Sequence, residues 1–201
     1  MRLRTLAILP LIALGSTAGL AQEARTCNAA TFPAEPTFAE ARVKGQGPAW
    51  LHEARDDCPW LGGESCRTGA AGSYGDPVIV SRTRAGYACV YLFAPDGDHS
   101  GWMKLDRLVF QTPRLRTEPE DWTGNWAAPG SAPIRLSLDF GNVAMDAAGL
   151  QGRLEKFGNR ATYTRADCTV KLTLLPGAMV AHDNGRCGEG GVMISGVYTR
   201  D

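Results

Sequence analysis

Six cysteines place the strongest constraint on the fold of this chain, because their number is even and they fall into two groups. Cys27, Cys58, Cys66 and Cys89 precede residue 100, and Cys168 and Cys187 follow it. In an exported chain such cysteines predict disulfide bonds, and the grouping predicts that each half closes its own. Cys168 is therefore expected to pair with Cys187. The first four allow three pairings. Cys58 with Cys66 is favoured, because two glycines let the short segment between them bend, and Cys27 with Cys89 would follow.

Residues 1–21 have the three parts of a secretory signal peptide. Arg2 and Arg4 provide a basic start, residues 6–14 are almost wholly apolar, and small residues precede Gln22. The apolar run is too short to cross a bilayer comfortably, which takes about twenty residues. We therefore expect cleavage, no membrane insertion of the mature chain, and a location in the periplasm or outside the cell.

The charge of the mature chain is nearly balanced. The sequence has 21 basic and 21 acidic residues, and Arg2 and Arg4 leave with the signal peptide, so 19 basic residues face 21 acidic ones. No long run of one sign is present. A surface for nucleic acid or for an anionic membrane is therefore not expected.

Short β-branched and alternating segments separated by turn residues predict an all-β protein. Residues 47–110 are expected to form one small barrel, and residues 121–201 a second antiparallel barrel, both stapled by disulfides. Residues 111–120, which are polar and contain two prolines, are expected to be a linker. Residues 22–46 lack strand alternation and are expected to form an N-terminal arm, with a short helix over residues 37–43 as one option.

The first of these barrels resembles a known family. Residues 76–80 (DPVIV) and 87–93 (YACVYLF) are followed by residues 101–108 (GWMKLDRL). This order resembles bacterial SH3-like domains over roughly residues 55–110. In that family a strand ending in Gly-Trp leads through one helical turn into the last strand. The resemblance implies a small barrel that recognises a peptide.

The second half carries another resemblance, to the terminal β module of proteobacterial envelope proteins related to lysozyme-inhibitor-like chains. It rests on a W-x-G-x-W opening and on a cysteine-containing turn that precedes a strand ending in G-x-Y. The matching residues are Trp122, Gly124, Trp126, Asp183, Asn184, Cys187, Gly188, Gly196, Val197 and Tyr198. The resemblance implies inhibition of lysozyme or of another hydrolase as an alternative function.

Catalysis is not expected. Residues 63–67 superficially resemble the cysteine neighbourhood of peptidoglycan transpeptidases, but that family needs a histidine ahead of the cysteine in a much larger β domain. His52 is the only histidine before Cys66, and a disulfide-bonded Cys66 cannot form the thiolate that this chemistry requires.

Metals and cofactors are not expected either. His52, His99 and His182 lie far apart and lack the spacing of a zinc site. Asp96 and Asp98 flank a glycine, and such a sequence is better explained by turn geometry than by calcium binding.

Binding is therefore the predicted activity. Aromatic side chains on a small barrel can line a groove for a peptide, and Trp60, Tyr74, Tyr91 and Trp102 are the candidates. Glu189, in the glycine-rich segment after Cys187, is a candidate partner contact. Trp122 and Trp126 are expected to plug the second barrel.

The predicted function is that of a non-catalytic binding protein of the bacterial envelope. Its partner would be a peptidoglycan peptide or an envelope protein, and inhibition of a hydrolase is the alternative.

Overall fold

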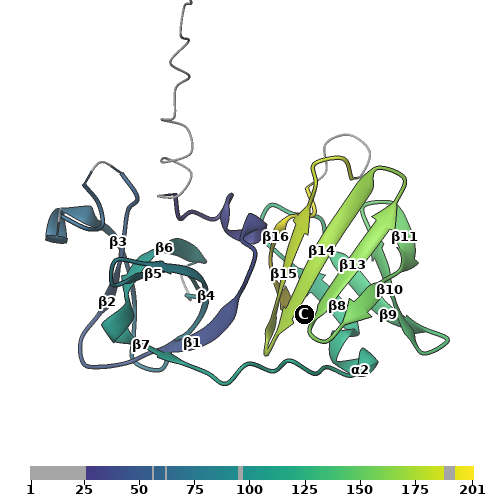
Figure 1. Cartoon of the computed structure of the whole chain (residues 1–201), viewed down its shortest axis with the longest axis horizontal. Coiled ribbons are helices and arrows are strands. Elements are labelled where there is room, and N and C mark those ends of the chain that lie inside the picture. The colour runs from purple at the N-terminus through teal and green to yellow at the C-terminus, as the bar shows by residue number, and fades with distance from the viewer. Residues whose placement is uncertain (1–25, 56, 62, 95–96, 188–192) are drawn as a thin grey trace, which may run out of the picture.

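The computed structural model describes residues 26–55, 57–61, 63–94, 97–187 and 193–201. The predicted signal peptide, Gly62, Asp96 and Glu189 lie outside these residues. The fold is all-β and disulfide-bonded, as predicted, and consists of a seven-stranded and a nine-stranded sheet (Figure 1). In the part of the chain that is described, no helix has the length and apolar character needed to span a membrane.

The seven strands of the first sheet curl around an apolar core. Their spatial order is β3 (Arg67–Gly72), β2 (Ala49–His52), β6 (His99–Lys104), β5 (Tyr87–Leu92), β4 (Pro77–Arg84), β1 (Ala39–Val43) and β7 (Leu108–Phe110). Leu51, Val90 and Met103 lie fully buried in the core of this sheet. The 3-10 helix η3 (Leu105–Arg107) connects β6 to β7. A helical turn therefore lies between these two strands of the sheet.

Residues 37–43 do not form the helix given as one option, because residues 39–43 are the strand β1. This strand lies inside the sheet and pairs with β4 on one side and β7 on the other. Ala41 and Val43 are buried whereas Arg42 between them is exposed. Because both edges of the strand find hydrogen-bond partners, tertiary pairing outweighs the weak local preference for a helix.

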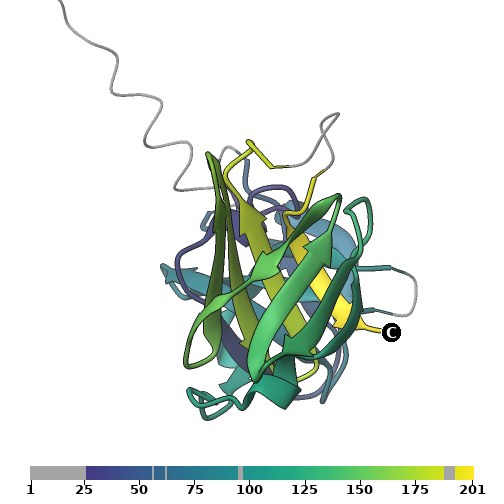
Figure 2. The same ribbon diagram turned by 90° about the vertical axis from the view of Figure 1, so that its right-hand side faces the viewer.

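The second sheet closes into a barrel. Its order is β11 (Leu150–Arg153), β10 (Asn142–Ala147), β9 (Ile134–Asp139), β8 (Gly124–Ala127), β16 (Gly196–Arg200), β15 (Ala178–Asp183), β14 (Cys168–Leu175), β13 (Arg160–Arg165) and β12 (Glu155–Phe157). Only Leu154 separates β11 from β12, and its N–H donates to the carbonyl of Val143 at 2.8 Å. Residues 150–157 therefore act as one long strand that pairs with β10 by its first half and with β13 by its second (Figure 2).

Side chains fill the interior of this barrel, and the prediction for two tryptophans is confirmed. Trp122, at the end of the short helix α2 (Pro119–Trp122), and Trp126 of β8 are 0% and 1% exposed in its core. The Trp122 indole N–H donates to Thr117 Oγ1 at 2.9 Å, and the Trp126 indole N–H donates to the Trp122 carbonyl at 3.0 Å. Both indole N–H groups thus have hydrogen-bond acceptors, and the two rings close the end of the barrel.

Three disulfides join the pairs that the sequence favours: Cys27–Cys89, Cys58–Cys66 and Cys168–Cys187. The second of these closes a short loop that includes the 3-10 helix η2 (Gly63–Cys66). The third ties the start of β14 to the segment that follows β15.

Residues 26–38, here called the N-terminal clasp, pack between the two sheets (Figure 1). Phe32, in the 3-10 helix η1 (Phe32–Ala34), is 0% exposed and belongs to a cluster with Tyr91 of the first sheet and Val180 and Val197 of the barrel. The clasp is bound to the first sheet by the Cys27–Cys89 disulfide.

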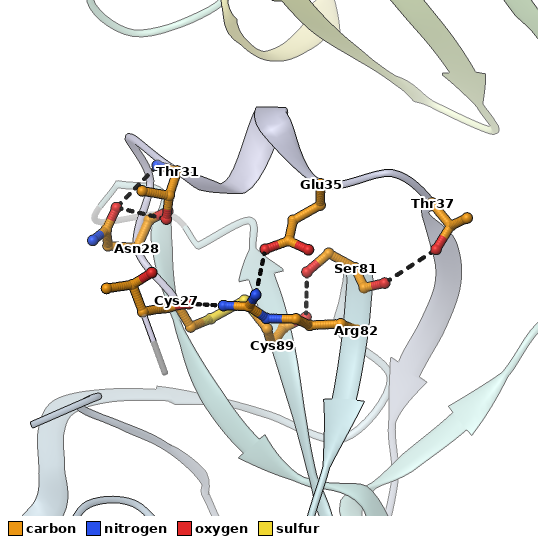
Figure 3. Close-up of polar contacts among 9 residues, drawn as sticks. Cys27, Asn28, Thr31, Glu35, Thr37, Ser81, Arg82 and Cys89 are labelled. Carbon is orange, nitrogen blue, oxygen red and sulfur yellow. Dashed lines mark hydrogen bonds and ion pairs between the residues drawn. A yellow bond between two sulfur atoms is a disulfide. The ribbon is translucent and has the colours of Figure 1, made fainter. Parts of the chain in front are cut away.

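Polar contacts reinforce this attachment (Figure 3). Arg82 of β4 forms an ion pair with Glu35 at 3.2 Å and donates to the Thr26 carbonyl. Thr37 Oγ1 donates to the Ser81 carbonyl.

Candidate functional site

Two of the predicted groove residues, Trp60 and Trp102, lie in contact but do not form an open groove. Trp102 of β6 is 0% exposed. The half-buried Trp60 ring covers it edge-on at 5.2 Å, and the Arg82 guanidinium lies 5.6 Å from its ring centroid. Trp60 itself stacks on Tyr87 at 6.2 Å. Trp102 therefore belongs to the core between the sheets and presents no surface to a partner, which corrects the prediction of an aromatic groove around it.

The two tyrosines of the predicted groove have opposite environments. Tyr91 is 5% exposed, and its hydroxyl donates to Asp98 Oδ2 at 2.8 Å. Burial, and then this hydrogen bond, raise the pKa of Tyr91 far above its usual range. Tyr74, in the turn between β3 and β4, is 79% exposed. Of the described candidates, only Tyr74 and part of Trp60 are accessible to a ligand.

An open cleft lies elsewhere on the first sheet, where sequence reasoning did not place one. It has a volume of about 500 Å³ and is lined by residues 46–48, by β2, by η2 and by the β6–η3 connection. The lining includes side chains that can stack on a ligand, carry charge or form hydrogen bonds: Trp50, His52, Arg67 and Lys104. We call it the first-sheet cleft.

One arginine holds a wall of this cleft in place. Arg107 of η3 donates from Nε to the Lys44 carbonyl at 3.1 Å and from Nη2 to the Gly47 carbonyl at 2.7 Å. It also donates to the carbonyls of Gln46 and Pro48 at 3.1 and 3.3 Å. A guanidinium offers five donors in a rigid fork, so a single side chain can satisfy a run of turn carbonyls. This loop is thereby preorganised.

The cleft combines an indole face with positive charge. The Arg67 guanidinium lies 5.1 Å from the Trp50 ring centroid, a cation–π distance, and donates to Glu64 Oε1 at 2.8 Å. Lys104, at the end of β6, is exposed. Glu64 and Asp106 also line the cleft, and Glu64 pairs with Arg67, so it is the aromatic face next to Lys104 that suits an amphipathic ligand carrying a carboxylate.

His52 forms part of the base of the cleft and is buried there. It is 5% exposed, and its Nδ1–H donates to the Trp102 carbonyl at 3.2 Å. Burial lowers the pKa of His52, and the nearby positive charges of Lys104 and Arg67 lower it further, against the opposing effect of the hydrogen bond. The imidazole therefore serves packing and hydrogen bonding here.

The segment that follows β15 is anchored by a buried carboxylate. Asp183 is 9% exposed; its Oδ1 accepts from the Gly185 N–H at 2.7 Å, and its Oδ2 accepts from the N–H groups of Ile194 and Ser195 at 3.0 and 2.9 Å. The Cys168–Cys187 disulfide holds the same segment to β14. Residues on both sides of residues 188–192 are thus tied to the end of the barrel.

Ser195, His182 and Asp183 lie close together here, but they are not arranged as a catalytic triad. Ser195 Oγ donates to Asp183 Oδ2 at 3.0 Å, and His182 Nδ1 lies 3.5 Å from the same oxygen of Ser195. In a triad the histidine stands between the serine and the aspartate. Among the described residues, no group of three or more His, Cys, Asp or Glu side chains could hold a metal ion.

The sequence contains a partial signal for the first-sheet cleft. Lys104 precedes the turn at residues 105–107 and Arg107 ends it, and Trp50 is one of the aromatic residues of the first half. Nothing in the spacing of residues 50, 67 and 104 shows that they meet, because β2, β3 and β6 become neighbours only through sheet pairing. No family model, no curated protein and no solved structure matches the chain.

Proposed function

We propose that this chain is an exported, non-catalytic binding protein of the bacterial envelope, and that the first-sheet cleft holds a peptide of peptidoglycan or of an envelope protein. The observation that carries the proposal is the cleft of about 500 Å³ in which Trp50, Arg67 and Lys104 converge. Its volume lies within the range of small-molecule and peptide sites, about 300–1,000 Å³.

The cleft has side chains that complement a peptide, and its walls lose little conformational entropy when a peptide binds. Trp50 offers an apolar face to a peptide and Lys104 attracts a carboxylate on it, whereas Arg67 pairs with Glu64 and holds the Trp50 ring by a cation–π contact. The Arg107 hydrogen bonds and the Cys58–Cys66 disulfide hold the walls before a ligand arrives. A preorganised site loses less conformational entropy when it binds.

The test is co-sedimentation of the mature, disulfide-bonded protein with purified peptidoglycan sacculi. We expect the wild-type protein to pellet, and Trp50→Ala and Lys104→Glu to weaken retention by about tenfold, the size of one lost aromatic or charge-assisted contact. Lys171→Glu, an exposed lysine of the barrel, and Phe140→Ala, 92% exposed on the barrel, are the matched controls and should pellet like wild type.

If the wild-type protein fails to pellet, the same protein is used to capture partners from periplasmic extract. Capture of one protein that depends on Trp50 and Lys104 supports the protein-partner form of the proposal. Retention on sacculi that is equal in all four variants overturns the assignment of the cleft.

One observation favours the alternative, inhibition of lysozyme or of another hydrolase. The segment after β15 is tied to the barrel at both ends, by Cys187 and by the N–H groups of Ile194 and Ser195 on Asp183. A loop with a rigid base is the device by which protein inhibitors enter an enzyme cleft at low entropy cost. The test is the hydrolysis of soluble substrate by lysozyme in the presence of the protein, without sacculi. Unchanged hydrolysis at a large excess of the protein argues against this alternative for lysozyme.

A further inference from the structure

We propose that a groove between the two sheets, separate from the first-sheet cleft, is a docking site for an extended acidic peptide segment of a partner protein. The groove has a volume of about 630 Å³ and lies where the outer faces of β1 and β4 meet the turn between β14 and β15. Residues 111–114 of the linker line it as well. Figure 1 shows this linker passing from β7 to α2 on the side of the molecule opposite η1.

The floor of the groove is apolar. Its accessible apolar residues are Pro77 at the start of β4, Phe93, which follows β5, and Pro176 of the β14–β15 turn, whereas Val78, Ile79 and Ala178 of the lining are already buried. Apolar side chains of a ligand would therefore be buried against both sheets at once. Sites of this kind occur preferentially where two structural units meet.

The groove continues into two smaller hollows, of about 80 and 180 Å³. Arg114 and Pro176 line all three. The combined site is therefore elongated and runs along the linker from β4 to the vicinity of α2. A trough of this shape fits an extended chain better than a compact ligand.

The charges along this trough are predominantly positive. Four arginines line it, Arg42, Arg114, Arg160 and Arg200, against two acids, Glu40 and Asp121. This local excess contrasts with the mature chain, in which acidic residues slightly outnumber basic ones.

The two acids offset this excess only in part, because they are outnumbered by the four arginines. Asp121 Oδ2 accepts from the Glu118 N–H at 2.8 Å, and its Oδ1 lies 3.5 Å from Arg114 Nη2. Burial raises the pKa of Glu40, partly offset by Arg42. Arg160 is exposed, and among the described residues no carboxylate forms an ion pair with it. Arg42 donates to the Gly75 carbonyl at 2.9 Å, and Arg200 lies 4.7 Å from the Trp126 ring centroid, so Arg160 is the guanidinium most open to a ligand in a lining that keeps a net positive charge.

An extended peptide matches both properties of the trough. Its successive side chains point to opposite sides, so alternate residues can face the apolar floor while the others face the arginines. Guanidinium groups bind carboxylates through paired, charge-assisted hydrogen bonds. The occupant that fits is thus a segment in which apolar residues alternate with Asp or Glu.

The experiment measures fluorescence anisotropy of a fluorescein-labelled peptide of about ten residues in which Glu alternates with Val, long enough to follow a trough at about 3.3 Å per residue. The mature, disulfide-bonded protein is titrated into it. We expect saturable binding that weakens strongly in about 0.5 M salt, where exposed charges are screened. A peptide in which Lys replaces Glu should not bind.

Variants locate the site. Arg114→Glu combined with Arg160→Glu should weaken binding by at least about tenfold, since two charge-assisted contacts become repulsive. Arg165→Glu, an exposed arginine at the other end of β13, is the matched control and should bind like wild type. Equal thermal unfolding of the three proteins shows that the fold is intact.

Absence of saturable binding overturns the proposal, and so does equal binding by wild type and the double variant. Loss of binding in Trp50→Ala but not in the double variant also overturns it, because the peptide would then occupy the first-sheet cleft. The result is independent of the sacculus experiment.

Discussion

Trp102 shows how strongly its neighbours decide what an aromatic residue does. Its ring is 0% exposed. The centroid of the Trp60 ring lies 5.2 Å from the Trp102 ring centroid, and the Arg82 guanidinium lies 5.6 Å from it. Its backbone carbonyl accepts from His52 Nδ1. A residue with these contacts stabilises the fold, and its removal alters binding only by altering the structure.

We predict that Trp102→Ala lowers the free energy of unfolding by about 3–5 kcal/mol, the usual cost of removing a buried tryptophan. Tyr74→Ala should change it by less than about 0.5 kcal/mol, because a 79% exposed side chain loses little packing. Urea titration of both variants measures the difference. Similar unfolding midpoints for Trp102→Ala and wild type would contradict the packing described here.

The hydrogen bonds of Asp183 make the stability of the fold depend on pH. Burial raises the pKa of Asp183, but the N–H groups of Gly185, Ile194 and Ser195 and the Ser195 hydroxyl together bring it below its ordinary value of 3.8. The folded state therefore binds the proton less readily than the unfolded state. The resulting stabilisation is present above about pH 4 and is lost as the pH falls through the lowered pKa.

We predict that Asp183→Asn is less stable than wild type near pH 7 by about 1.5–3 kcal/mol, the contribution of hydrogen bonds to a charged group. The difference between the two proteins should narrow as the pH falls below about 4, because wild type then loses the same charge. Thermal unfolding at a series of pH values checks this. A difference that stays constant down to about pH 2 would contradict it.

At the scale of elements, the N-terminal clasp is the segment whose structure depends most on a cross-link. It has little regular structure apart from η1, yet Phe32 and Cys27 are almost fully buried. The Cys27–Cys89 disulfide joins residues 62 positions apart, whereas Cys58–Cys66 joins residues 8 apart. Because the stabilisation from a cross-link grows with the loop that it closes, the first should contribute more.

We predict that replacing Cys27 and Cys89 by Ser lowers the stability by about 4 kcal/mol, and that replacing Cys58 and Cys66 lowers it by about 2.5 kcal/mol. Hydrogen exchange should accelerate in residues 27–38 in the first variant and not in the second. Unchanged exchange in the clasp would show that packing alone holds it. Native wild-type protein should contain no thiol that reacts with an alkylating agent, since none of the described cysteines is free.

At the scale of the whole molecule, the two sheets are joined by a shared apolar cluster in addition to the linker. Phe32, Ile79 and Trp102 pack in the same cluster as Val180 and Val197. The N-terminal clasp lies on one side of this contact and the linker on the other (Figure 1). The groove proposed for an acidic peptide exists only while the sheets keep this arrangement, because both sheets line it.

We predict that Phe32→Ala uncouples the two sheets. In wild type, ¹⁵N relaxation should give one rotational correlation time for both, and in the variant the two values should fall and diverge. Phe157→Ala removes a ring that is 88% exposed on the barrel and should behave like wild type. A single unchanged correlation time in Phe32→Ala would show that the remaining contacts suffice to hold the sheets together.

Much of the local structure could be predicted from the residues themselves. Turn residues between β-branched segments indicated most of the strands. Cysteine grouping indicated Cys168–Cys187 and left three pairings open for the other four cysteines, of which the structure has the favoured one. The strand at residues 39–43 was missed, because its short alternation of Ala41, Arg42 and Val43 becomes stable only between β4 and β7. Local preference is too weak to settle so short a segment.

The candidate sites were decided by the tertiary structure. Sequence alone determined that the chain is all-β, that its cysteines pair within each half, and that tryptophans fill the C-terminal barrel, because these properties follow from alternation, composition and spacing. Which face of a strand is covered depends on what packs there: Trp60 and Arg82 cover the Trp102 ring, whereas Trp50, Arg67 and Lys104 line an open cleft. Local alternation shows which side chains share a face of a strand, but whether that face is covered depends on contacts between distant segments.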